Sequence, residues 1–177
     1  MRKLKNSELH RLSVEAFKKV KKLPVVVVLD NIRSLNNIGS VFRTSDAFLI
    51  EKIYLCGITA QPPHRDIQKT ALGATESVDW SYIENTRDCL TKLKQEGYHC
   101  VAIEQADESV MLNEFECKHH NKIAVVFGHE IKGVQQTIID QCKQCIEIPQ
   151  LGTKHSLNIS VTAGVVLWQL FKGYKKT

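Results

Sequence analysis

The sequence predicts an α/β fold in which a mostly parallel sheet is flanked by helices. Short apolar runs alternate with segments of helical periodicity along the chain, and this alternation is typical of a parallel sheet with helices on both faces. One run, residues 25–29, is apolar throughout and largely β-branched, which predicts a strand buried on both faces. The length of 177 residues suits one domain with a sizeable core.

Residues 1–22 are expected to form a basic helical arm ahead of the main domain, which spans residues 23–177. The apolar residues of the arm recur at helical spacing: Leu9, Leu12, Ala16 and Val20. Ser7 is a candidate N-cap, and Pro24 is expected to end the helix before the first strand begins.

The rest of the chain continues the alternation. Further strands are expected at residues 52–56, 78–83, 98–103, 123–127 and 144–148. Helices are expected at residues 38–48, 86–95, 135–141 and 158–171, with a short one after Asp66. The segment Gln61-Pro62-Pro63 indicates a loop.

The positive charge of the chain is concentrated in the arm. The net charge is +5, but residues 1–22 contain eight basic and two acidic residues, so the remainder is close to neutral. A basic segment on a near-neutral body is typical of proteins that bind a phosphate backbone. The alternative is a solvated helix that only aids solubility.

The composition argues against membrane and secreted classes. Hydrophobic residues make up 43% and charged residues 24% of the chain, an ordinary balance for a globular protein. No apolar run approaches the roughly 20 residues that a membrane-spanning helix needs, and the N-terminus lacks the apolar core of a signal peptide. Six cysteines fit a reducing compartment. We therefore expect a cytoplasmic protein with no membrane partner.

The cysteines also raise the question of a zinc site. Cys142 and Cys145 form one C-x-x-C pair, and Cys117, His119 and His120 lie close together elsewhere. A zinc ribbon normally has two such pairs at defined spacing. We therefore expect no metal, and we expect Cys142 to close a helix and Cys145 to open a strand.

Three polar loops after predicted strands are candidate site segments, because ligands of open parallel sheets bind beyond the carboxyl ends of the strands. In the first loop, Asn37 is a candidate helix cap, and Gly39 permits close approach of a backbone or ligand. Arg43 lies one turn further on the same helical face, where a guanidinium can bind an RNA phosphate. The alternative is an ordinary capped helix with a surface arginine.

The other two loops have the same character. Residues 128–133 place Glu130 and Lys132 between two glycines, an arrangement that can present backbone N–H groups to a ligand. Residues 149–158 form a long irregular connection, and such connections are often functional. Ser156 or Asn158 can cap the helix that follows. The alternatives are a tight turn and a plain connection across the sheet edge.

Together the three loops resemble the signature motifs of the SpoU (TrmH-type) RNA 2′-O-ribose methyltransferases, of the SPOUT superfamily. The first motif is Asn37-x-Gly39-x-x-x-Arg43. The second is Val126-Phe127-Gly128-x-Glu130-x-x-Gly133. The third is Ile148-Pro149, then Gly152, then Ser156-Leu157-Asn158. The resemblance covers about residues 24–172.

The resemblance implies properties that composition and periodicity do not. It implies a deep trefoil knot in the C-terminal segment, and a homodimer with the active site at the interface. It also implies a bent S-adenosylmethionine held in the knotted crevice, largely by backbone groups. The residues expected to bind this cofactor are Glu104, Gly128, Ile148, Leu151, Ser156 and Leu157. Among them Glu104 is expected to accept hydrogen bonds from the cofactor ribose.

The resemblance also implies catalytic roles. Arg43 corresponds to the arginine to which the family's chemistry is attributed. Because a guanidinium is effectively always protonated, we expect Arg43 to hold the phosphate and stabilise the attacking oxygen, with the proton leaving to phosphate or water. Positioning of Arg43 and the target ribose is expected from Asn37, Glu130, Ser156 and Asn158.

The expected partner is structured RNA. Contacts are expected from Arg43 and from the lysines of the arm, and the affinity they contribute falls with salt: Lys3, Lys5, Lys18, Lys19, Lys21 and Lys22. Lys172, Lys175 and Lys176 extend this surface. The arm is too short to form a separate RNA-binding domain, which favours tRNA over rRNA.

Three alternatives remain. The first is the same chemistry on rRNA. The second is a non-catalytic RNA-binding relative, which would be expected to lack Arg43 or the third motif. The third is a nucleotide-binding oxidoreductase, which would need a glycine-rich turn directly after the first strand, whereas residues 30–37 contain no glycine.

Overall fold

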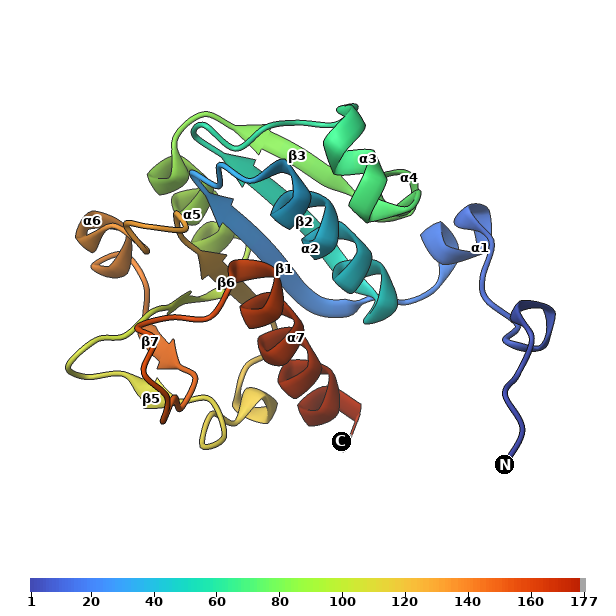
Figure 1. The fold of residues 1–177 in the computed structure, drawn as a ribbon. Helices are drawn as coiled ribbons and strands as arrows, with labels where there is room; N and C mark the ends of the chain where they lie inside the picture. The colour runs from blue at the N-terminus through green and yellow to red at the C-terminus, as the bar shows by residue number, and fades with distance from the viewer. Residues whose placement is uncertain (176–177) are drawn as a thin grey trace.

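The computed structural model describes residues 1–175, so Lys176 lies outside the described residues. Seven strands form one sheet in the order β3-β2-β1-β6-β4-β7-β5, and every pair of neighbours is parallel. Helices cover both faces of the sheet (Figure 1). The predicted fold class is confirmed, and the trefoil knot stays a prediction.

The elements lie close to the positions expected from the sequence. The strands are β1 (Leu23–Asp30), β2 (Ile50–Cys56), β3 (Trp80–Ile83), β4 (His99–Ile103), β5 (Val110–Met111), β6 (Ile123–Phe127) and β7 (Gln144–Glu147). The helices are α1 (Val14–Lys19), α2 (Leu35–Ala47), α3 (Arg65–Ala71), α4 (Ala74–Ser77), α5 (Thr86–Gln95), α6 (Gln136–Ile139) and α7 (Ile159–Lys175). Two 3₁₀ turns lie at Asn6–Glu8 and Cys117–His119. The sequence did not predict β5, α4 or the second 3₁₀ turn, since two to four residues are too few to show a period.

Strands β1 and β6 form the centre of the sheet. Val25 pairs with Ile123 and Leu29 with Phe127 in register, and both apolar runs are almost completely buried. Burial on both faces accounts for their continuous apolar sequence, because each face packs against a layer of helices.

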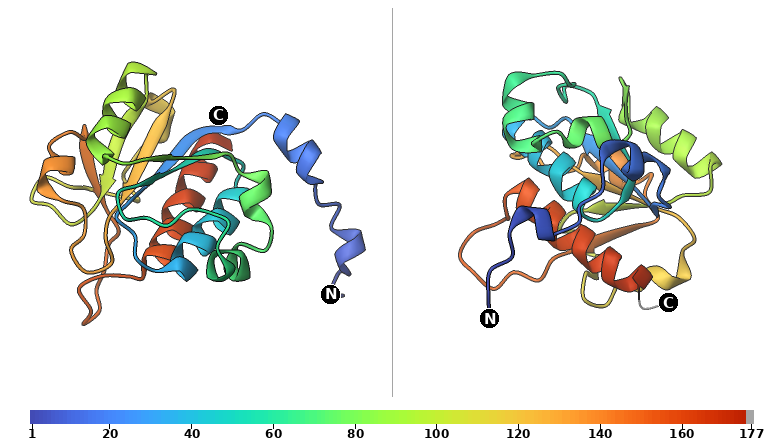
Figure 2. Two further views of the ribbon diagram at one scale, coloured as in Figure 1. Left: turned by 90° about the horizontal axis from the view of Figure 1, so that it is seen from above. Right: turned by 90° about the vertical axis from the view of Figure 1, so that its right-hand side faces the viewer.

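The sheet separates two apolar cores, one beneath each of the helix layers that Figure 2 shows. On one face, Val41 of α2, Ile67 of α3 and Leu167 of α7 pack against alternate residues of β1. On the other face, Leu90 of α5 and Ile138 of α6 pack against the intervening residues. Helices α2 and α7 lie side by side (Figure 1), and both begin at the carboxyl edge of the sheet.

The N-terminal arm differs from the single amphipathic helix that its spacing predicted. It consists of the Asn6–Glu8 turn and the short helix α1. Ser13, not Ser7, caps α1 by accepting a hydrogen bond from the Ala16 N–H at 3.2 Å. Leu9, Leu12 and Val20 are exposed. The arm therefore lacks the packed apolar face that would stabilise one continuous helix.

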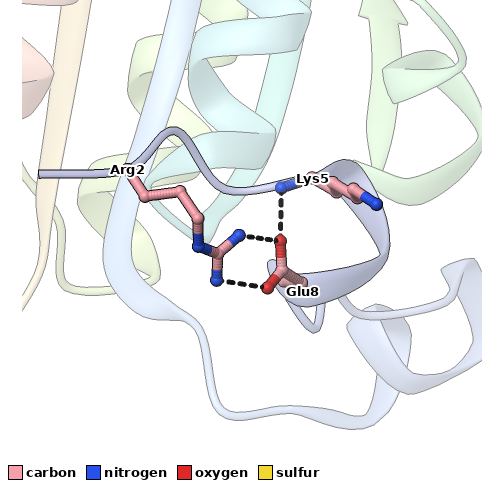
Figure 3. Close-up of polar contacts among 3 residues, drawn as sticks. All are labelled: Arg2, Lys5 and Glu8. Atoms are coloured by element: carbon pink, nitrogen blue, oxygen red, sulfur yellow. Dashed lines mark hydrogen bonds and ion pairs between the residues drawn. The ribbon is translucent and has the colours of Figure 1, made fainter.

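Contacts of Glu8, Phe17 and Lys22 fix the local shape of the arm. The Glu8 carboxylate accepts two hydrogen bonds from the Arg2 guanidinium, at 2.9 and 2.7 Å, and one from the Lys5 N–H at 2.7 Å (Figure 3). Phe17 is buried in the main core, and Lys22 donates hydrogen bonds to the carbonyls of Phe17 and Val20 at the end of α1. Lys22 therefore closes a helix, whereas Lys3, Lys5, Lys18, Lys19 and Lys21 are exposed.

None of the helices within residues 1–175 is both long enough and apolar enough to cross a bilayer.

Candidate active site

A cavity of about 660 Å³ opens at the carboxyl edge of the sheet. Its walls come from the ends of β4, β6 and β7 and from the first turn of α7. This is where a parallel sheet is expected to bind a ligand, and the volume lies within the range of small-molecule sites.

The loop after β6 forms one wall and depends on its two glycines. His129 and Gly133 exchange backbone hydrogen bonds of 3.1 and 2.8 Å, which fold the loop back on itself. A Cβ atom on Gly128 would lie 2.3 Å from the carbonyl carbon of Gly133, and Gly133 has a φ of +64°. A side chain at the first position would force the turn open, and one at the second would be strained.

Glu130, carried by this turn, holds the start of α2. Its carboxylate accepts hydrogen bonds from the backbone N–H groups of Arg33 and Ser34, at 3.0 and 2.9 Å, and from the Asn37 amide at 3.2 Å. The Asn37 oxygen in turn accepts from the Asn158 amide at 3.2 Å. The three polar loops, far apart in sequence, therefore meet in one hydrogen-bonded chain.

The two asparagines of this chain have different backbone roles. Ser34, not Asn37, caps α2, by accepting a hydrogen bond from the Asn37 N–H at 3.3 Å. Asn37 lies inside the helix and is largely buried, which leaves its side chain for Glu130 and Asn158. Asn158 does cap α7, because its oxygen accepts from the Ser160 N–H at 2.9 Å. The cap predicted at Asn37 was wrong because the helix begins three residues earlier than its apolar period shows.

A family model for the SpoU rRNA methylases matches residues 24–168 of the chain. This chain belongs to the SpoU rRNA methylase family. One relative is the 23S rRNA (guanosine-2'-O-)-methyltransferase RlmB of Neisseria meningitidis, 29% identical over 144 residues that make up 81% of this chain and 56% of that protein. This SpoU-family chain thus spans less than two thirds of the length of the curated relatives that it matches first.

Solved structures agree with the family fold. The TrmH/SpoU tRNA modifying enzyme of A. aeolicus superposes with a TM-score of 0.80 at 25% identity, over 92% of this chain and 81% of the other. The AdoMet-bound rRNA methyltransferase from Sinorhizobium meliloti also gives a TM-score of 0.80, at 24% identity, over 88% of this chain and 59% of the other. The SpoU fold therefore extends over nearly the whole chain.

Most residues expected to bind the cofactor line the cavity of this SpoU protein. They are Glu104, Gly128, Ile148, Ser156 and Leu157. The Glu104 carboxylate accepts hydrogen bonds from the N–H groups of Gln105 and Val134, both at 2.9 Å, so its position is fixed against the glycine turn. Leu151 does not line the cavity, and its side chain is fully exposed.

Arg43 lies outside the cavity. It is exposed on α2, and it forms no hydrogen bond or ion pair with another residue in the described part of the chain. Gly39, one turn earlier, faces α3: a Cβ there would lie 2.2 Å from the Ile67 carbonyl oxygen. The glycine of the first motif therefore permits close packing of two helices, and the arginine is left free for a partner outside its own chain.

Two residues of the site, Gln105 and Thr59, had no clear signal in the sequence. The Gln105 amide holds the third loop through the His155 carbonyl oxygen at 2.7 Å. The Thr59 hydroxyl, buried beneath the first loop, donates to the Leu29 carbonyl and accepts from the Ile32 N–H, at 3.0 and 2.9 Å. Thr59 follows the end of β2, the neighbour of β1 in the sheet, so no pattern within the first loop itself indicates this contact.

The cysteines and histidines do not gather into a metal site. Within residues 1–175, no group of three or more histidine, cysteine, aspartate or glutamate side chains is arranged to hold a metal ion. Cys142 follows the end of α6 and Cys145 lies inside β7. Burial raises the pKa of the Cys142 thiol to about 12, which keeps the thiol protonated and unreactive.

The hydrogen bonds to Glu130 predict a pH-dependent stability. Partial burial acts to raise the pKa of Glu130, but the Arg33 and Ser34 N–H groups outweigh it, so this pKa lies below its ordinary value. A lowered folded-state pKa stabilises the protein above the unfolded value, about 4.3, and this contribution is lost as the pH falls further. Glu130→Gln should therefore lower the free energy of unfolding by about 1–2 kcal/mol at pH 7 and by less near pH 3.

Urea denaturation at several pH values measures this difference. Glu108→Gln is the matched control, because Glu108 is exposed and should change little at any pH. An equal loss at pH 7 and pH 3 for Glu130→Gln would contradict a role for the charged carboxylate.

Proposed function

We propose that this chain transfers the methyl group of S-adenosylmethionine to a ribose 2′-hydroxyl of structured RNA. The observation that carries the proposal is the hydrogen-bonded chain of Asn37, Glu130 and Asn158, which joins all three family motifs beside one cavity. A capped helix or a tight turn needs no such joining of distant loops. The intact Arg43 and third motif argue against a non-catalytic relative.

The residues of the cavity fit the proposed cofactor. The backbone of the loops after β6 and β7 offers N–H and carbonyl groups, Ile148 and Leu157 offer apolar surface, and Glu104 offers a fixed carboxylate for ribose hydroxyls. When bound, S-adenosylmethionine supplies a methyl group activated by an adjacent sulfonium. The main task of the protein is then to align the attacking oxygen with that methyl group.

Arg43 is proposed to bind the phosphate beside the target ribose and to stabilise negative charge on the attacking oxygen. Because Arg43 lies outside the cavity of its own chain, this role needs a second copy of the chain. Glu130 and Asn37 hold the helix that carries Arg43, and Ser156 and Asn158 are proposed to position the ribose.

The proposed second copy has a suitable surface on α7. Val161, Val165 and Trp168 recur along one helical face and are 51%, 39% and 49% exposed. Gly164 lies between them with open space above it, so another helix can approach closely. Thr162 of the same helix lines the cavity. A homodimer formed through this face would bring α2 of one copy toward the cavity of the other.

The basic arm is proposed to bind RNA away from the target nucleotide. It joins the sheet at the start of β1, and the eight residues of β1 separate it from the carboxyl edge by about 25 Å at about 3.3 Å per residue. Lys18, Lys19 and Lys21 project from a segment that Phe17 fixes to the body. The lysines therefore form a firmly attached phosphate-binding patch.

Replacing Lys18, Lys19 and Lys21 with glutamine should weaken RNA binding and reduce its dependence on salt. Each lost phosphate contact lowers the slope of log affinity against log salt by about 0.9. Filter binding at several salt concentrations measures the slope. The control replaces Lys92 and Lys94 of α5 and Lys143, just before β7, with glutamine; all three are exposed and lie outside the arm. Equal salt slopes for the two triple variants would contradict a role of the arm in RNA binding.

Among RNA substrates, we favour tRNA. The A. aeolicus TrmH/SpoU tRNA modifying enzyme superposes on 92% of this chain with a TM-score of 0.80. The higher identity to the Neisseria enzyme favours rRNA as the second candidate. With either substrate, we expect the protein to act in the cytoplasm, where unmodified RNA and reduced thiols occur together.

The testing experiment is transfer of labelled methyl groups to tRNA and rRNA from cells that lack the gene, followed by nuclease mapping of 2′-O-methyl positions. Label at one tRNA position supports the full proposal. Label only in rRNA supports the chemistry and overturns the preferred substrate. No label in either RNA overturns the proposed activity.

A further inference from the structure

We propose that the imidazole of His155 accepts the proton of the target ribose 2′-hydroxyl. This rests on the proposed function and concerns a step for which Arg43 is unsuited, because a guanidinium stays protonated. The acceptor must lie beside the attacking oxygen and be largely unprotonated near neutral pH. Imidazole is the side chain that most often takes up a proton in enzymes, because the neutral ring carries a nitrogen lone pair that can accept one.

Most other titratable groups of the cavity are already engaged. The titratable residues lining the cavity are Glu104, His129, Glu130, Lys132, Glu147 and His155. Lysine at position 132 is a cation and cannot accept a proton. The carboxylates of Glu104 and Glu130 each accept backbone hydrogen bonds, and that of Glu147 accepts one from the Ser109 hydroxyl at 2.8 Å. Carboxylates are also weaker bases than imidazole.

His129 is engaged through its own turn. Its Nδ1 accepts a hydrogen bond from the Ile131 N–H at 3.0 Å and a longer one from the Lys132 N–H at 3.4 Å. Because Nδ1 accepts, the proton of the neutral ring lies on Nε2. Neither nitrogen of His129 is then available to take a proton without breaking the turn that carries Glu130.

His155 combines a free ring with a fixed backbone. Its carbonyl oxygen accepts from the Gln105 amide at 2.7 Å, and its exposed ring makes no hydrogen bond or ion pair with any of residues 1–175. It directly precedes Ser156 and lies three residues before Asn158, which is bonded to Asn37. His155 lines the cavity where the target ribose is proposed to bind.

The step balances with this acceptor. The 2′-oxygen bonds to the methyl carbon as the methyl–sulfur bond breaks, and the hydroxyl proton moves to a ring nitrogen of His155. The positive charge of the sulfonium is thereby replaced by that of the imidazolium, which then loses its proton to water. The products are the 2′-O-methyl ribose and S-adenosylhomocysteine, a neutral thioether.

The test compares His155→Gln with the wild type in single-turnover methyl transfer from pH 5.5 to 9.5, on the RNA that the mapping experiment identifies. The wild-type rate should rise with pH and then level off. The variant should be about 10²- to 10⁴-fold slower at pH 7.5 and show no plateau, while binding of S-adenosylhomocysteine stays unchanged. His119→Gln is the control, because His119 is exposed and pairs with Glu116 outside the cavity.

A second readout needs no cofactor. In protein with isotope-labelled histidine, RNA with a 2′-hydroxyl at the target should shift the ring nitrogen resonances of His155, and RNA with a deoxyribose there should shift them far less. Equal shifts with the two RNAs would overturn the role of His155 as proton acceptor, and so would a His155→Gln variant with the wild-type rate and pH profile. The proposed function would stand in either case. No methyl transfer by the wild type would overturn both.

Discussion

Replacing Arg43 with alanine is expected to slow methyl transfer by at least about 10²- to 10³-fold, the usual loss when one group that stabilises a developing oxyanion is removed. Arg43 is exposed on α2 and bonds to no residue described in its own chain, so its removal should leave the fold and the cavity intact. The measurement is single-turnover methyl transfer, together with calorimetric binding of S-adenosylmethionine and a thermal melt.

Two further variants test whether the guanidinium group of Arg43 and its place on α2 both matter, beyond its positive charge. Arg43→Lys keeps the charge but loses the planar, two-pronged donor, so its activity should fall between alanine and wild type. Arg87→Ala removes an exposed arginine from α5, on the opposite face of the sheet, and should have little effect. If Arg43→Ala lost cofactor binding or thermal stability instead of turnover, the residue would be structural.

Replacing both Val165 and Trp168 with glutamate is expected to separate the proposed dimer and to lower methyl transfer more than about 100-fold, because each site would lose the partner's arginine. Two carboxylates on a face that docks against its own copy would be buried without partners in the dimer, at a cost that exceeds the gain of docking. Light scattering after size exclusion measures the assembly, and the transfer assay measures the activity. Leu72→Glu, at another exposed apolar residue, is the control.

Mixing two inactive proteins tests whether the site is shared between copies. Arg43→Ala leaves the cavity intact, and Asn158→Ala leaves the arginine intact. After random exchange of subunits, about half of the dimers would contain one complete site, so about a quarter of the wild-type activity should return. An inactive mixture of exchanged subunits would mean that Arg43 serves the cavity of its own chain.

The sequence predicted the sheet and the three loops because these depend on local patterns. The run at residues 25–29 is apolar throughout, and a strand buried on both faces needs this pattern whatever surrounds it. The motif loops were found from the type and spacing of residues such as Gly128 and Glu130. Both properties are carried by neighbouring residues in the chain, so they can be seen without a structure.

Predictions that depended on the surroundings of a segment were less accurate. The arm has helical spacing, but Phe17 is its only apolar residue that is buried against the body. One short helix therefore forms in place of a long one. Asn37 appeared to be a cap, but the cap of α2 is Ser34. Local propensity allows each of these alternatives, and tertiary packing selects among them.

By itself, the sequence determined that this chain is an α/β protein with the motifs of an RNA methyltransferase family. Only the tertiary structure decided how those motifs meet. It brought Asn37, Glu130 and Asn158 into one hydrogen-bonded chain, left Arg43 outside the cavity of its own chain, and placed an apolar face on α7 beside that cavity. The physical reason is that a hydrogen bond between residues about 100 positions apart depends on how the strands order themselves in the sheet, and no local pattern encodes that order.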